Sequence, residues 1–229
     1  MLWPLAIALF LVGYNLLPFF AGRLHERVYV PLNLGVGLLL MGVARWGLGL
    51  SWEGMGWSGK GLGASLGWGA LVGLVLGLPA LVGAFLLPRL PGPAQSFAPP
   101  DAPSSPASLA YHVLLRIPLG TALFEEVAFR GVVFGLVAQR LSPLHALLFS
   151  AGAFALWHIG PILVRLRAHE VHGLGPLVWQ WAGGLGGTFL GGLLLGGLRW
   201  GTGTLAGPVV AHTLLNALGL LAWSLLRRP

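Results

Sequence analysis

Two adjacent glutamates, Glu125 and Glu126, lie within the apolar stretch 119–136, although the whole chain has only six acidic residues. A carboxylate in the interior of a membrane costs at least a few kcal/mol, so such residues usually face a protein interior or a water cavity and have a function. Arg130 follows four residues after Glu126, and residues at this spacing share a helix face. We therefore expect Glu126 and Arg130 to form an ion pair, while Glu125 points about 100° away and stays free for chemistry.

Two further apolar segments carry polar residues at the same four-residue spacing. Phe154 precedes His158 on one segment, and His212 precedes Asn216 on the other. A site inside a helical bundle is assembled from inward-facing side chains of several helices. A carboxylate can accept a proton from water, an imidazole can transfer protons or bind a metal, and an amide can donate to an oxyanion. These residue types are those that hydrolysis requires.

Other interpretations of the same residues remain open. Glu126 and Arg130 can be a buried ion pair that only fixes helix packing, and each histidine can be a hydrogen-bonded core residue. Buried glutamate, histidine and arginine also mark ion pathways, so a proton-coupled transporter is the main functional alternative. The sequence contains no clear internal repeat that pairs two halves, whereas many transporters have one.

The composition indicates which elements must position these residues. Of 229 residues 56% are hydrophobic and 8% charged, with a mean hydropathy of +0.83, whereas roughly a quarter of a soluble domain is charged. Backbone groups in lipid must be satisfied within each segment, and the apolar runs are long and continuous, so helices are expected. The sequence therefore predicts an all-α, polytopic transmembrane bundle of about seven to eight spans.

Net charge and cysteine content exclude several functions. The formal net charge is +7 and the pI near 11.3, but the 13 Lys and Arg are scattered between apolar segments. Such residues lie near lipid headgroups and set topology, so we expect no nucleic-acid partner. The absence of cysteine excludes disulfides, a thiol nucleophile and thiolate metal sites.

We divide the chain into N-terminal transmembrane helices (1–87), a Pro-rich linker loop (88–108) and a catalytic transmembrane helical core (109–229), which together form one integral membrane domain. The expected spans cover 1–21, 29–50, 62–87, 109–137, 143–164, 177–198 and 203–226. In the sixth of them Gly183, Gly187 and Gly191 recur every four residues, which predicts a face on which a neighbouring helix packs closely.

Three motifs together carry a resemblance to a known family. They are E-E-x-x-x-R at 125–130, F-x-x-x-H at 154–158 and H-x-x-x-N at 212–216. In this order and on separate apolar segments, they resemble the CAAX prenyl endopeptidases and bacteriocin-processing enzymes of the CPBP (Abi) family, over about half of the chain. The resemblance implies an intramembrane endopeptidase in which Glu125 and His158 activate water and His212 and Asn216 stabilise the oxyanion. Glu126, Arg130 and Phe154 would support them, the first two by holding the Glu125 carboxylate.

The resemblance leaves the cofactor and the substrate open. The family is commonly classed with metallopeptidases, but a glutamate-dependent mechanism without metal fits the same residues. If a divalent metal such as zinc binds, Glu125, His158 and His212 are the candidate ligands. We expect a membrane-associated or lipidated peptide or protein as substrate, and the bacterial inner (cytoplasmic) membrane as the location. A catalytically silent scaffold or immunity protein with the same fold is a further alternative.

Overall fold

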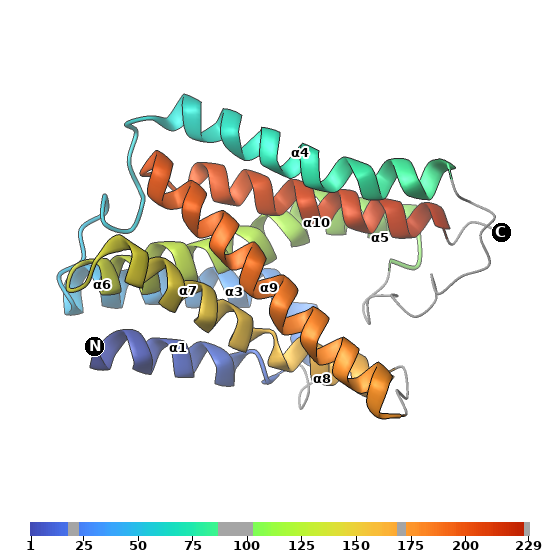
Figure 1. The fold of residues 1–229 in the computed structure, drawn as a ribbon, viewed down its shortest axis with the longest axis horizontal. Coiled ribbons are helices and arrows are strands. Elements are labelled where there is room, and N and C mark those ends of the chain that lie inside the picture. Colours follow the sequence, from blue (N-terminus) through green and yellow to red (C-terminus); the bar gives the residue numbers. More distant parts are fainter. Residues whose placement is uncertain (18–22, 87–102, 169–172, 227–229) are drawn as a thin grey trace.

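The computed structural model describes residues 1–17, 23–86, 103–168 and 173–226, and within these residues every regular element is a helix (Figure 1). The all-α prediction is therefore confirmed. Three of the elements, labelled η, are π-helical. In chain order the elements are α1 (Leu2–Tyr14), α3 (Arg23–Gly42), η1 (Val43–Gly47), α4 (Leu62–Leu86), α5 (Pro106–Tyr111), η3 (His112–Leu123), η4 (Glu126–Val133), α6 (Phe134–Ala138), α7 (Pro143–Trp157), α8 (Ile159–Ala168), α9 (Leu174–Thr202) and α10 (Ala206–Leu226).

Five helical stretches among the described residues are long and apolar enough to cross a membrane. They are Glu26–Gly47, Leu62–Leu86, Pro143–Arg167, Leu174–Thr202 and Ala206–Leu226. The first expected span is not one of them, because α1 has 13 residues and a spanning helix needs about 20; residues 18–21 of that expectation lie outside the described part. The helical run 106–138, which contains both glutamates, is also not among the five. A total of seven to eight spans stays a prediction.

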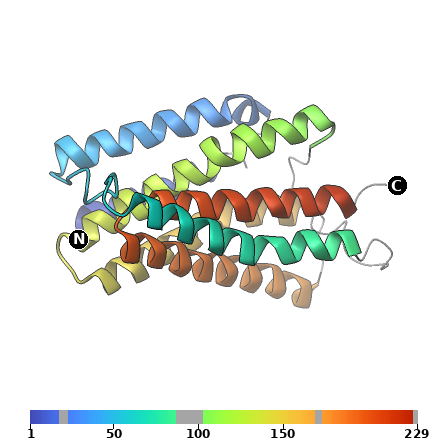
Figure 2. The same cartoon turned by 90° about the horizontal axis from the view of Figure 1, so that it is seen from above.

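Helices α4 and α10 lie side by side along their length in both views (Figures 1 and 2). Glycines on α4 allow this close approach, because a Cβ added at Gly73 would lie 2.7 Å from the Cβ of Leu214. A Cβ added at Gly77 would lie 2.7 Å from Cδ1 of Leu218. Small residues at a helix contact are typical of membrane bundles. The contact fixes α10, the helix that carries His212 and Asn216.

The prediction of the packing face on α9 was wrong by about one residue. A Cβ added at any of the three predicted glycines would meet no other atom within 4 Å: Gly183, Gly187 and Gly191. The contact is made instead by Gly192, where a Cβ would lie 3.0 Å from the Cα of Ala151 in α7, and by Gly184 against Ile162 in α8. Glycines recur along two faces of this helix, and the position of α7 and α8 decides which face packs.

One unbroken helical run leads from Pro106 to Ala138 and contains both glutamates. The Ser105 hydroxyl caps its start by accepting from the Ser108 N–H at 3.1 Å. The helix thus begins inside the expected linker 88–108, of which residues 88–102 lie outside the described part. Most of the run is π-helical, and Pro118 within η3 has no N–H to donate to a regular α-helical ladder. π-helical turns occur frequently at functional sites.

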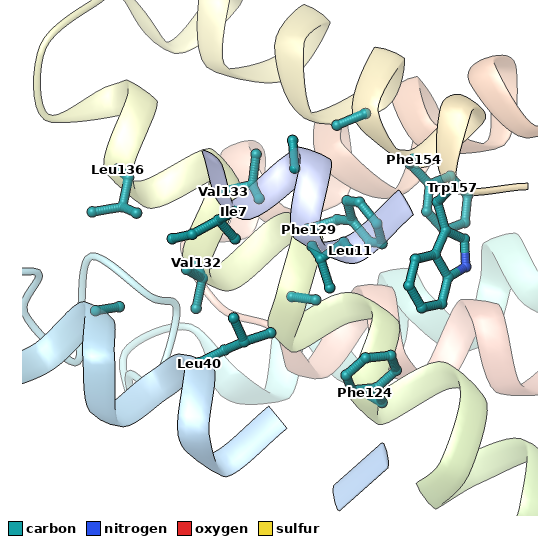
Figure 3. Packing of buried hydrophobic residues seen from close by; sticks show 14 of the residues in the cluster. Ile7, Leu11, Leu40, Phe124, Phe129, Val132, Val133, Leu136, Phe154 and Trp157 are labelled. Carbon is teal, nitrogen blue, oxygen red and sulfur yellow. The ribbon is translucent and has the colours of Figure 1, made fainter. Parts of the chain in front are cut away.

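This run lies at the centre of the main hydrophobic core (Figure 3). Phe124, Phe129 and Val133 are at most 2% exposed. Helices α1 and α3 cover one side of the run with Leu11 and Leu40 among others, and α7 contributes Phe154 and Trp157. The N-terminal helices are therefore part of the packing that holds the glutamate segment in place.

Candidate active site

Glu126 and Arg130 form the ion pair that their spacing predicts. The Arg130 Nη1 lies 3.1 Å from Oε1 of Glu126, and neither side chain is exposed. The other terminal nitrogen, Nη2, donates to the carbonyl of Gly192 in α9 at 3.4 Å. The guanidinium carbon also lies 4.1 Å from the ring centroid of Phe154, a favourable cation–π distance. Desolvated charges require such compensation, and each contact comes from a different helix.

The same Glu126 oxygen binds His212, a contact that sequence reasoning missed. Nδ1 of His212 lies 2.8 Å from Oε1 of Glu126, although 86 positions separate the two residues. A carboxylate paired with arginine accepts hydrogen bonds, so Nδ1 carries the proton and donates it. The bond fixes the orientation of the imidazole and leaves Nε2 as the nitrogen available for chemistry. Helix α10 is thereby tied to the glutamate segment.

Glu125 approaches the opposite nitrogen of this imidazole. Its Oε2 lies 3.8 Å from Nε2 of His212, and the oxygen is buried with no hydrogen-bond partner in the described part of the chain. This separation is too long for a direct hydrogen bond, and a polar contact of this length is one that a water molecule can bridge. Glu125 and Glu126 therefore flank one imidazole, each at its own nitrogen.

His158 lies at the junction between α7 and α8 and is half-buried. Its Nδ1 lies 2.8 Å from the backbone carbonyl oxygen of Phe154. A carbonyl oxygen only accepts, so Nδ1 carries the proton and Nε2 of the neutral ring is a proton acceptor. Both histidines of the site thus use Nδ1 for structure and keep Nε2 for chemistry.

The Phe154 ring joins the parts of the site. Its centroid lies 4.6 Å from that of His158 and 6.1 Å from that of His212, in both cases edge to face. The Arg130 guanidinium lies over the face of the same ring. Phe154 is only 4% exposed, so it forms an apolar wall that excludes water from this side of the ion pair. The sequence motif predicts that Phe154 lies beside His158. It does not predict the contacts of Phe154 with His212 and Arg130.

Asn216 lies one helical turn after His212 on α10 and is half-buried. No hydrogen bond links its side chain to either glutamate or either histidine among the residues that the structure describes. The contacts above join Glu125, Glu126, Arg130, Phe154 and the two histidines, and none of them includes Asn216.

If a metal binds, Glu125, His158 and His212 are the candidate ligands, and the described residues do not bring these three side chains together as one metal-binding group. Within the described ranges, no three His, Asp or Glu side chains lie close enough together to hold a metal ion. Glu125 and His212 are neighbours, but His158 does not complete a three-ligand group with them. A catalytic zinc site needs three protein ligands that converge on one point.

Comparison with known proteins identifies the region that contains the site. Residues 107–218 match the model of the Rce1-like family, described as type II CAAX prenyl endopeptidase Rce1-like. The match covers just under half of the chain and includes all three motifs. Comparisons with curated proteins and with solved structures gave no match.

The membrane-length helices and this membrane-protease family together support an integral membrane protein. Residues 107–218 are thus similar to the Rce1-like family of proteases, in agreement with the resemblance carried by the three motifs.

Proposed function

We propose that this protein is a CAAX protease-like intramembrane endopeptidase that hydrolyses peptide bonds of membrane-associated or lipidated peptides and proteins. The observation that carries the proposal is the pair formed by Glu125 Oε2, buried and without a partner, and His212 Nε2, 3.8 Å away. A water held between these atoms would be polarised in a site that excludes bulk solvent. We place the protein in the bacterial inner membrane, where membrane-anchored peptides are the substrates we expect.

The hydrolytic step follows from the free atoms of the site. A water molecule donates a proton to the Glu125 carboxylate while its oxygen forms a bond to the scissile carbonyl carbon. His158, with Nε2 as an acceptor, orients the second hydrogen of this water. The C–N bond then breaks, and the proton on Glu125 passes to the leaving nitrogen. Glu125 thereby returns to its carboxylate form and no residue is consumed.

His212 is suited to stabilise the oxyanion. Since its Nδ1 is bound to Glu126, it can donate to the developing negative charge only through Nε2, in the doubly protonated form. Glu126 balances the positive charge of that form, and Arg130 balances Glu126. We assign Glu126 to the support of His212 in addition to its pairing with Arg130. The Asn216 amide is the second donor to the oxyanion in this scheme.

The proposal predicts that His212→Ala lowers the rate of peptide cleavage by about two orders of magnitude or more, as expected when a proton-transferring or oxyanion group is lost. The rate is measured in detergent and in liposomes, on a panel of membrane-anchored peptides with and without a lipid. His145→Ala is the matched control, because His145 is exposed and contacts Ser142 in the α6–α7 connection.

Three outcomes separate the candidate functions. Cleavage by the parent and by His145→Ala, but not by folded His212→Ala, supports the protease. Equal cleavage by all three proteins contradicts the proposed site. If no member of the panel is cut, proton flux across the liposome membrane is measured next. A proton flux that His212→Ala abolishes would favour the transporter. The absence of any proton flux would favour the silent scaffold or immunity protein.

We also predict that cleavage persists after treatment with a strong chelator such as 1,10-phenanthroline. The reason is the donor geometry: the described residues offer no three converging ligands for a metal ion. The control is the non-chelating isomer 1,7-phenanthroline, added at the same concentration. A loss of activity with the chelator alone, restored by added Zn²⁺, would contradict the prediction.

A further inference from the structure

Helix α1 lies outside the matched region 107–218 but contacts the helix that carries His158. Nδ2 of Asn15, the residue that follows α1, donates to the backbone carbonyl of Trp157 at 2.9 Å. Trp157 is the last residue of α7 and directly precedes His158. The last four carbonyls of an α-helix have no partner inside the helix, and in an apolar environment each needs a donor from elsewhere. Asn15 provides one such donor.

The other carbonyls of this turn are bonded locally. The His158 ring Nδ1 binds the carbonyl of Phe154 at 2.8 Å, and its backbone N–H donates to the carbonyl of Ala155 at 3.0 Å. The Leu156 carbonyl also accepts from a backbone N–H at the end of the helix. In addition to these local bonds, the bond from Asn15 ties the turn to a distant part of the chain.

Tyr14 adds a second tie between α1 and the site. Its ring stacks on the Trp157 ring, with centroids 6.0 Å apart and an interplanar angle of 21°. Its hydroxyl donates to the side-chain oxygen of Asn33 in α3, and the Asn33 amide donates to the Gly120 carbonyl in η3 at 2.8 Å. Tyr14 and Asn33 are both buried, so the bonds between them are shielded from solvent. The end of α1 is thus fixed against both α7 and the glutamate run.

Trp157 connects these ties to the glutamates. Its ring lies 5.7 Å from that of Phe124 and 5.6 Å from that of Phe129 (centroid distances), and these two residues bracket Glu125 and Glu126 in sequence (Figure 3). A shift of the Trp157 backbone would move this side chain and His158 together. The position of both therefore depends on the residue that holds the Trp157 carbonyl.

We propose that Asn15 is a positioning residue of the active site, which holds the α7–α8 turn through the Trp157 carbonyl and so fixes the place of His158. The inference rests on the proposed function, in which His158 and Glu125 act on the same water. It extends the catalytic unit beyond the matched region, to the end of the first helix.

The test compares Asn15→Ala with the parent in the full-length protein. We expect kcat to fall about tenfold, the effect of losing roughly one hydrogen bond in the transition state, with KM nearly unchanged. Asn15→Gln, which keeps the amide donor, should restore part of the rate. Leu9→Ala is the matched control, because Leu9 lies on α1 and is 63% exposed. An unchanged kcat in folded Asn15→Ala would overturn the proposal.

A double-variant cycle separates positioning from general stability. In a His158→Ala background, Asn15→Ala should have no further effect on kcat, because the residue that it positions is already gone. Losses that add would overturn the proposal and assign Asn15 a structural role. If His158→Ala is as active as the parent, the failure is that of the proposed mechanism, since the role of His158 itself is then wrong.

A measurement that does not depend on cleavage completes the test. Diethyl pyrocarbonate modifies the free nitrogen of a histidine, and His158 keeps Nε2 free. Asn15→Ala should change the modification rate of His158 severalfold, while His145 in the same sample reacts as it does in the parent. Equal rates at His158 in both proteins would overturn the proposal even if no peptide substrate were found.

Discussion

Glu125→Gln should keep the fold and lose at least about two orders of magnitude in the rate of peptide cleavage, the usual range for a general base. Glutamine has the shape of glutamate and keeps a carbonyl oxygen, but it cannot take a proton from water. The charge removed is that of a carboxylate whose Oε2 has no hydrogen-bond partner, so little structural stabilisation is lost. Single-turnover cleavage in detergent measures the chemical step.

Two further variants make this result specific. Glu53→Gln removes a carboxylate from the exposed loop between η1 and α4, outside the site, and should cleave like the parent. Glu125→Asp retains the carboxylate on a shorter side chain and should keep more activity than Glu125→Gln. Cleavage by Glu125→Gln at the parent rate would show that another group accepts the proton from water.

Much of the fold was predictable because lipid permits few structures. Long apolar runs in a bilayer must be helices, and the ranges expected for the later spans agree with α7 to α10 within several residues. The first expected span failed because hydropathy does not show where a helix ends: α1 stops at Tyr14, and its polar end residues Tyr14 and Asn15 bond to other helices. Polar residues such as Tyr14 and Asn15 near the end of an apolar run are the sequence signal that could have indicated where α1 ends.

The candidate site was predictable only where its contacts are local. The pair of Glu126 with Arg130 follows from a spacing of four residues. The bond between Glu126 and His212 joins two helices distant in sequence, and no periodicity specifies it. The expectation that Glu125 points away from the ion pair was incomplete, since both glutamates reach the same imidazole. The π-helical segment η4 begins at Glu126, directly after Glu125, so the regular α-helical angle does not hold along this part of the run.

Arg130→Met should destabilise the folded protein by about 3–5 kcal/mol, the range measured when one partner of a buried ion pair is removed. The reason is that Glu126 is not exposed at all, so its carboxylate would remain buried with His212 as its only polar partner among the described residues. Methionine has a similar length and an apolar side chain that fits against Phe154. The measurement is the free energy of unfolding in detergent, obtained by titration with a denaturant.

The double variant Arg130→Met with Glu126→Gln tests whether the unpaired charge is the cause. It removes both charges, while the glutamine oxygen can still accept from Nδ1 of His212. We expect most of the lost stability to return, because replacing both partners of a buried pair is often nearly neutral. Cleavage should stay low, since Glu126 would no longer balance the charge of the doubly protonated His212 at Nδ1. If the double variant is as unstable as Arg130→Met, the stabilisation comes instead from the contacts of Arg130 with Gly192 and Phe154.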